Sequence, residues 1–139
     1  MDNKSRKILF VIVEDKYFIS HRLHLAMHAM ERGYEVGLLC KNSKYKDFLK
    51  NQGIKVFDWS LVRGSFNLFS EVRAFFEILM TLLRFSPNLI HAVALKPVIY
   101  SSFASKLVFL KSRVFALGGL GFIFSSQKVL AKILRPFII

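Results

Sequence analysis

Apolar residues along the chain alternate between continuous runs and helix-like spacings, and this pattern predicts alternating strands and helices. The run Lys7–Val13 (KILFVIV) is almost wholly apolar, as expected of a strand buried on both faces of a parallel sheet. It is predicted as the first, central strand. The next stretch repeats apolar residues at helical intervals, with Ser20 as its predicted N-cap and Gly33 as its stop, and Glu35–Cys40 is predicted as the second strand.

The same alternation continues along the rest of the chain. The expected elements are a short helix over Lys44–Asn51, a strand over Ile54–Trp59, a long helix over Leu68–Phe85, a strand over Asn88–Ala94, a helix from Pro97 to about Leu110, and a strand over Ser112–Leu117. Strands that alternate with helices in this way are typical of βαβ units. The pattern therefore predicts an α/β fold with a parallel sheet, in a single domain over residues 1–139.

A glycine-rich segment follows the last predicted strand, at Phe115–Ser126 (FALGGLGFIFSS). Its G-G-x-G spacing matches neither the G-x-G-x-x-G fingerprint of dinucleotide-binding folds nor the G-x-x-x-x-G-K-[ST] loop that cradles nucleotide phosphates. Ligands of open α/β sheets bind beyond the carboxyl ends of the strands. The position of the segment therefore makes it a candidate site, without indicating the ligand.

The composition combines a high apolar content with a strong positive charge. Of the 139 residues, 53% are hydrophobic, and the formal net charge is +12 at pH 7. The length fits one domain. The charge indicates an anionic partner, either a membrane surface or nucleic acid. The basic residues are scattered and form no nucleic-acid-binding motif, so no nucleic acid is expected as a partner.

Cys40 is the only cysteine, so no internal disulfide can form and a reducing compartment is expected. Its apolar neighbours predict a core position near the end of a strand. A membrane span needs about 20 mostly apolar residues, and the longest apolar zone, from Phe66 to Phe85, is interrupted by charged residues. The chain is therefore expected to be cytoplasmic, with membrane contact left open.

Three segments taken together resemble a known family. These are Phe18–Cys40 (FISHRLHLAMHAMERGYEVGLLC), Asn88–Leu107 (NLIHAVALKPVIYSSFASKL) and Gly118–Ser126 (GGLGFIFSS). They resemble the first helix and second strand, the fourth strand and helix, and the glycine loop of family 4 glycosyltransferases of the GT-B fold. The resemblance covers nearly the whole chain. It implies a Rossmann-like parallel sheet with helices on both faces, the N-terminal, acceptor-side half of a GT-B fold.

Within that family the sequence is similar to enzymes that extend sugars on polyprenyl-diphosphate carriers in bacterial surface polysaccharide assembly. The resemblance implies a lipid-linked glycan acceptor, and a nucleotide-sugar donor held by a C-terminal domain through a basic residue and a pair of glutamates. No E-x7-E pair lies in a suitable context here, and the chain is expected to end partway through the first domain, so that residues 1–139 form a single, incomplete acceptor-side domain without the donor-binding one. We therefore expect no cofactor bound by this chain and no transfer by the chain alone. The expected alternatives are one half of a split enzyme with a separately encoded donor-binding domain, a non-catalytic membrane-recruiting subunit, or a truncated gene remnant.

Candidate acceptor-binding residues lie at the expected carboxyl edge of the sheet. Ser20, His21 and Arg22 are expected to begin the first helix there. Arg22 is suited either to bidentate phosphate recognition or to an ion pair with Glu14 or Asp15. Those two carboxylates are themselves either solvated loop residues or a general base toward an acceptor hydroxyl.

Four further positions complete the candidate acceptor site. Lys96 stands at the amino-terminal end of a predicted helix, where it either contacts an acceptor diphosphate or is solvated. His91, in the fourth strand, is either functional or a core histidine bonded to the backbone. Gly119 and Gly121 either let the backbone pass close to the acceptor or form a tight turn. No catalytic residue is assigned.

Three histidines share one predicted helical face, at His21, His24 and His28. No cysteine or carboxylate is spaced to complete a tetrahedral site with them. No metal is therefore expected.

The long helix Leu68–Phe85 has apolar residues around most of its circumference. Either it is buried against the sheet, or its Phe-rich side rests in the interfacial layer of a membrane, with Arg73 and Arg84 reaching anionic headgroups. The segment Lys128–Ile139 adds a basic amphipathic pattern. We therefore expect an anionic membrane surface as a partner, and peripheral attachment at the inner, cytoplasmic face of the membrane.

Overall fold

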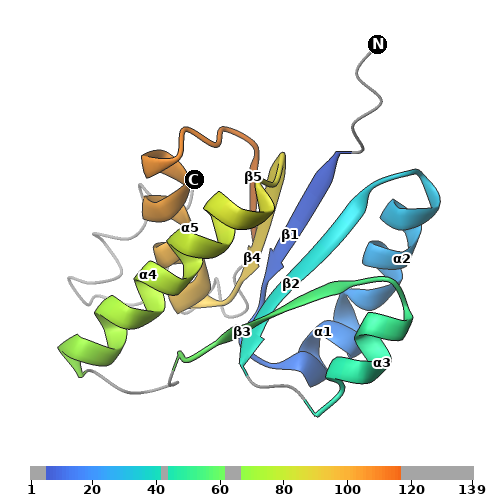
Figure 1. The fold of residues 1–139 in the computed structure, drawn as a ribbon, viewed down its shortest axis with the longest axis horizontal. Coiled ribbons are helices and arrows are strands. Elements are labelled where there is room, and N and C mark those ends of the chain that lie inside the picture. Colours follow the sequence, from blue (N-terminus) through green and yellow to red (C-terminus); the bar gives the residue numbers. More distant parts are fainter. Residues whose placement is uncertain (1–5, 42–43, 62–66, 117–139) are drawn as a thin grey trace, which may run out of the picture.

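Five parallel strands form one sheet in the computed structural model, which describes residues 6–41, 44–61 and 67–116 (Figure 1). The strands are β1 (Lys7–Val11), β2 (Glu35–Lys41), β3 (Lys55–Trp59), β4 (Leu89–Val93) and β5 (Arg113–Ala116). Their order across the sheet is β3-β2-β1-β4-β5. The first strand is therefore central, as predicted.

Helices cover both faces of the sheet, which confirms the predicted α/β fold (Figure 1). One face carries α1 (Asp15–His21), α2 (Leu23–Glu31) and α3 (Lys46–Asn51), and the other carries α4 (Leu68–Phe85) and α5 (Leu95–Leu107). Side chains of a strand point alternately to its two faces. Leu9 and Val11 accordingly belong to the core beneath α4 and α5, whereas Phe10 belongs to the core beneath α1.

The long helix α4 has the bounds predicted for it, because its end signals are local. The side chain of Asn67 accepts a hydrogen bond from the backbone N–H of Phe69 and caps the first turn. At the other end Ser86 adopts a left-handed conformation (φ 52°) directly before Pro87, which cannot continue a helix.

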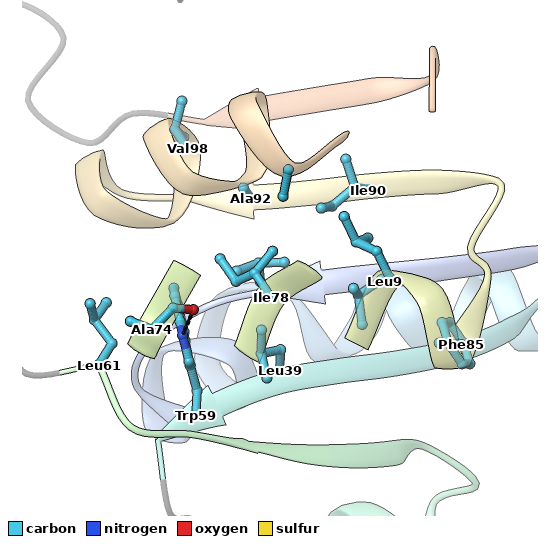
Figure 2. Packing of buried hydrophobic residues seen from close by; sticks show 13 residues of the cluster. Leu9, Leu39, Trp59, Leu61, Ala74, Ile78, Phe85, Ile90, Ala92 and Val98 are labelled. Atoms are coloured by element: carbon cyan, nitrogen blue, oxygen red, sulfur yellow. Dashed lines mark hydrogen bonds between the residues drawn. The ribbon is translucent and has the colours of Figure 1, made fainter. Parts of the chain in front are cut away.

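One side of α4 forms the centre of the larger core (Figure 2). Ala74 and Ile78 pack in one cluster with Leu39 of the sheet. Trp59, at the end of β3, donates its indole N–H to the carbonyl oxygen of Ala74 at 3.0 Å. This bond satisfies the one polar atom of a buried indole and fixes α4 to the edge strand.

The order of the strands creates a switch point between β1 and β4. Val11 of β1 pairs with Leu39 of β2 on one side and with Ala92 of β4 on the other. The connection after β1 leads to the α1 face, and the connection after β4 leads to the α5 face. Connections that diverge in this way leave a crevice at the carboxyl ends of the two strands, where open α/β sheets bind ligands.

The start of the first helix differs from the prediction. Helix α1 begins at Asp15, directly after the strand, and Ser20 lies near its end, so the prediction of Ser20 as an N-cap was wrong. Glu14 takes the N-cap position with an extended backbone and no side-chain cap, which leaves no residue-type signal to read. Arg22, with a backbone that is not helical (φ −128°), separates α1 from α2.

Other boundaries move by one to three residues. β1 ends at Val11, α3 begins at Lys46, and α5 begins at Leu95 and ends at Leu107, with Pro97 in its first turn. Such shifts are ordinary at element ends. Among the described residues, no helix is both long and apolar enough to cross a membrane.

Candidate functional site

A pocket of about 490 Å³ opens at the carboxyl ends of β1 and β4. Its walls come from the loop after β1, the first turns of α1 and α5, and Leu61 after β3. Most of the lining is apolar, and the ionisable or hydroxyl side chains that it includes are Glu14, Tyr17 and Lys96. A mostly apolar hollow with a few polar groups is the usual form of a site for an organic ligand.

The backbone of Ala94 is strained where β4 passes into α5. Its φ of 82° and ψ of 167° lie in a region that only glycine adopts without cost, and Ala94 is the N-cap of α5. Its N–H donates to the carbonyl oxygen of Ala116 at 3.0 Å, which continues the sheet ladder by one residue. The tight turn places the start of α5 at the pocket wall.

Lys96 lies in the first turn of α5, as predicted, and lines the pocket. Its ammonium Nζ donates to Glu71 Oε1 at 2.7 Å, and both side chains are partly buried. The pair joins the first turns of α4 and α5. Lys96 is thus an ion-paired residue at the pocket, rather than the solvated lysine that was one of the two expectations.

His91 lies in β4 and accepts a hydrogen bond at Nε2 from Arg22 Nε, at 3.3 Å. Burial, together with the smaller effect of the neighbouring Arg22 charge, lowers the pKa of His91 to about 4. The ring is therefore neutral at pH 7, which leaves Nε2 free to accept. His91 also contacts the ring of Phe10, at 5.1 Å between centroids.

Ser20, His21 and Arg22 gather around Tyr17. The ring of His21 stacks on the ring of Tyr17, at 4.3 Å between centroids, and the Arg22 guanidinium lies 5.8 Å from the centre of the same ring. Ser20 Oγ is 2.6 Å from His21 Nδ1. The expectation that these three residues begin the helix at the sheet edge was wrong, because they end α1. Tyr17, which lines the pocket, connects them to it.

Three site residues were missed by sequence reasoning: Tyr17, Glu71 and Ala94. Glu71 lies 25 residues from its partner Lys96, and no periodicity reports such a contact. The strain at Ala94 has no residue-type signal, because alanine normally avoids that conformation. Gly119 and Gly121 lie outside the described residues.

The two adjacent carboxylates after β1 have different positions. Glu14 lines the pocket. Both carboxylate oxygens of Asp15 accept hydrogen bonds from the backbone. Oδ1 accepts from the N–H of Lys16 at 2.8 Å, and Oδ2 accepts from the N–H of Tyr45 at 3.4 Å. Of the two carboxylates, Glu14 is the one in the lining of this pocket.

The remaining candidate groups are the thiol of Cys40 and the histidines considered as metal ligands. Cys40 is buried in β2, as predicted, and desolvation raises the pKa of its thiol to about 12, so it stays protonated. Within residues 6–41, 44–61 and 67–116, no cluster of three His, Cys, Asp or Glu side chains is arranged to hold a metal ion. His28 Nδ1 lies 3.9 Å from Glu31 Oε2.

A parallel sheet of this order with its pocket at the switch point is a Rossmann-like domain, and glycosyltransferases of known structure share it. MurG from Acinetobacter baumannii superposes with a TM-score of 0.64 at 13% identity, over 81% of this chain and 34% of that one. The calicheamicin glycosyltransferase CalG4 gives 0.63 at 18% identity, over 96% and 37%. SnogD from Streptomyces nogalater gives 0.61 at 17% identity, over 97% and 38%. The fold is therefore the Rossmann-like fold that is found within GT-B glycosyltransferases.

The family model for glycosyl transferase 4-like proteins matches residues 7–138, and the chain belongs to this family. A search of curated proteins found no match. The chain spans between 34% and 38% of the length of the three solved structures named above.

Proposed function

We propose that this chain is the acceptor-binding part of a glycosyltransferase that transfers a sugar from a nucleotide-sugar to a lipid-linked glycan, in surface polysaccharide assembly. The observation that carries the proposal is the pocket between the loop after β1 and the start of α5, with Glu14 and Lys96 in its lining. Membership of the glycosyl transferase 4-like family supports the transferase chemistry. The similarity of Phe18–Cys40 and Asn88–Leu107 to enzymes acting on polyprenyl-diphosphate carriers supports the lipid-linked acceptor.

The chemistry of the pocket fits a phosphorylated sugar. The Glu14 carboxylate accepts hydrogen bonds from sugar hydroxyls. The Lys96 ammonium and the positive end of the α5 helix dipole attract the acceptor diphosphate. In the transfer step an acceptor hydroxyl attacks the anomeric carbon of the donor sugar. The bond between that carbon and the nucleoside diphosphate breaks, and the hydroxyl proton passes to the departing diphosphate. Within this proposal the chain's residues bind and orient the acceptor.

The nucleotide-sugar donor is proposed to bind to a second, donor-binding domain. That domain is encoded either separately or together with this chain. The 139 residues tested alone are therefore expected to be inactive. The chain is proposed to work peripherally at the inner face of the membrane, where a lipid-linked acceptor is presented and where its net charge of +12 meets anionic lipid.

The test combines the chain with a donor-binding domain that carries an E-x7-E pair. Radiolabelled transfer from a panel of nucleotide-sugars to lipid-linked glycans is measured for the chain alone and for the two pieces together. Product is expected only from the combination. Transfer by the chain alone would contradict the proposed division of labour, and the absence of product from every combination would favour a non-catalytic subunit or a gene remnant.

Acceptor binding is tested directly with geranyl diphosphate, a short soluble mimic of the carrier. Lys96→Ala is expected to weaken binding about tenfold or more, because a hydrogen bond to a charged group contributes roughly 1.5–3 kcal/mol. Lys55→Ala is the matched control, since Lys55 is also paired with a glutamate, Glu35, but lies in the edge strand β3. Equal affinities for the two variants, measured by titration calorimetry, would remove Lys96 from the site.

A further inference from the structure

Helix α4 carries large apolar side chains on the side that faces away from the sheet. We call this set the α4 outer face, and it consists of Phe69, Val72, Phe76, Met80 and Leu83, which are between 44% and 79% exposed. The spacing of three or four residues places all of them on one stripe of the helix. The opposite side of α4 is the one that packs on the sheet, through Ala74, Ile78 and Phe85 (Figure 2).

The core does not account for this stripe. A helix of a globular protein normally has one apolar stripe, with polar residues opposite to it. Here two apolar stripes lie on opposite sides, and only one is covered within the described residues. Contiguous exposed apolar surface of this kind marks an interaction site.

Basic side chains border the α4 outer face on the side toward β3. A hollow of about 680 Å³ there is lined by apolar side chains of α4 and β3, by Arg73 and Arg84, and by the acidic residues Asp58 and Glu77. Arg73 Nε donates to Glu77 Oε1 at 3.3 Å, while Glu77 Oε2 accepts from the backbone N–H of Ser60 at 2.7 Å. Glu77 is therefore anchored to the loop after β3, and Arg73 remains 67% exposed beside the stripe.

We propose that the α4 outer face lies in the interfacial layer of an anionic lipid bilayer, with Arg73 and Arg84 at the level of the headgroups. This inference rests on the proposed function, because it names the surface by which the chain reaches a lipid-linked acceptor. Charge complementarity favours an anionic bilayer as the occupant, because Arg84 borders the stripe, Arg73 stays 67% exposed beside it although it pairs with Glu77, and the chain as a whole carries 21 basic and 9 acidic side chains.

The proposal also sets the orientation of the pocket. Glu71, in the first turn of α4, is bonded to Lys96 at the pocket wall. Phe69 and Val72 belong to the same part of α4. Insertion of their side chains therefore brings the Lys96 side of the pocket close to the headgroup layer, which is where the diphosphate of a lipid carrier is held.

The test is co-sedimentation of the full 139-residue chain with vesicles that contain no glycan acceptor. Binding is expected to vesicles of phosphatidylcholine mixed with phosphatidylglycerol, and to be much weaker with phosphatidylcholine alone. Phe69→Ser combined with Phe76→Ser is expected to weaken binding roughly tenfold or more, because two buried phenyl groups are lost from the lipid phase. Arg73→Gln combined with Arg84→Gln is expected to weaken binding and to reduce its dependence on salt.

Phe48→Ser in α3 is the matched control, since Phe48 is also an exposed helical phenylalanine, at 43%. It is expected to leave vesicle binding unchanged. Circular dichroism of each variant checks that the fold is kept, and the exposure of the substituted side chains predicts that it is.

Three outcomes would overturn the proposal. The first is unchanged vesicle binding of the Phe69/Phe76 variant, with binding lost instead in Lys132→Gln combined with Arg135→Gln. The second is equal binding to neutral and anionic vesicles. The third is self-association of the chain that the Phe69/Phe76 variant abolishes, since the stripe would then join two copies. Because the vesicles hold no acceptor, and geranyl diphosphate binding is measured without vesicles, failure here is separable from failure of the proposed function.

Discussion

His91 and Arg22 form a contact between β4 and the junction of α1 and α2, across 69 residues of sequence. The contact depends on a neutral imidazole, because Nε2 must accept the hydrogen bond that Arg22 Nε donates. Protonation of His91 removes this acceptor and places a second positive charge beside the guanidinium. A low pH is therefore expected to weaken the contact between β4 and the junction of α1 and α2, and so to lower the free energy of unfolding.

The prediction concerns the free energy of unfolding between pH 7.5 and 4. The pKa of His91 is about 4 in the folded chain and near 6.5 when unfolded. The unfolded state therefore binds the extra proton first, and stability falls as the pH drops from about 6.5 toward 4, by about 1–2 kcal/mol after allowance for partial exposure. Urea unfolding at several pH values measures it. His91→Gln, which retains an acceptor but does not titrate, is expected to flatten this part of the profile, and parallel profiles would contradict the assignment.

If Lys96 binds the acceptor diphosphate as proposed, Glu71 and the bound anion compete for its ammonium group. Glu71→Gln keeps the size of the side chain and removes its charge, so the Lys96 ammonium loses its carboxylate partner. We expect the affinity for geranyl diphosphate to rise severalfold, by calorimetry at low salt, because a competing anion has been removed. If Lys96 is only a structural partner of Glu71, the variant is less stable and the affinity does not change.

At the scale of elements, Gly37 allows β2 to pass close beneath α4. A Cβ atom built at this position would lie 3.1 Å from the ring of Phe85 and 3.2 Å from the ring of Phe57. Those two rings also contact each other edge to face, at 5.6 Å between centroids. The absence of a side chain on β2 is thus a condition for the aromatic packing at the end of α4.

We predict that Gly37→Val lowers the free energy of unfolding by roughly 1–3 kcal/mol, as overpacking of a core usually does, and that Gly37→Ala has a smaller effect. Thermal or urea unfolding measures both. Phe57→Leu is expected to restore part of the loss in the Gly37→Val background, since it makes room for the new methyl groups. Full additivity of the two substitutions would argue against a steric cause.

Some elements were predictable from the sequence, and the reason lies in where their signals sit. Helix α4 matched its prediction because Asn67 and Pro87 mark its ends within a few residues. Helix α1 did not, because Glu14 caps it through backbone conformation alone. The central position of β1 followed from its continuous apolar run. The contacts of Lys96 with Glu71 and of Arg22 with His91 were not predictable, since each joins elements that only the tertiary fold brings together.

At the scale of the whole molecule, the two candidate surfaces share one end of the α4–α5 layer. The pocket takes part of its walls from the starts of α1 and α5, and Glu71, which is bonded to Lys96 at the pocket, lies between Phe69 and Val72 of the α4 outer face. The pocket proposed for the acceptor and the surface proposed for the membrane are thus held together by packing within the described part of the chain.

The central strand acquires its two neighbours at very different times during synthesis. β1 pairs with β2 early, but Lys7 meets Asn88 only across 81 residues, so β4 joins the sheet after most of the chain has been translated. Until β4 pairs with it, β1 is an edge strand of the sheet. Leu9 and Val11 then lack the side chains of α4 and α5 that bury them in the folded chain. Non-local pairing of this kind slows folding and exposes sheet edges to other chains. A chain that ends after β3 is therefore expected to expose β1 as an unpaired strand edge, open to pairing with other chains.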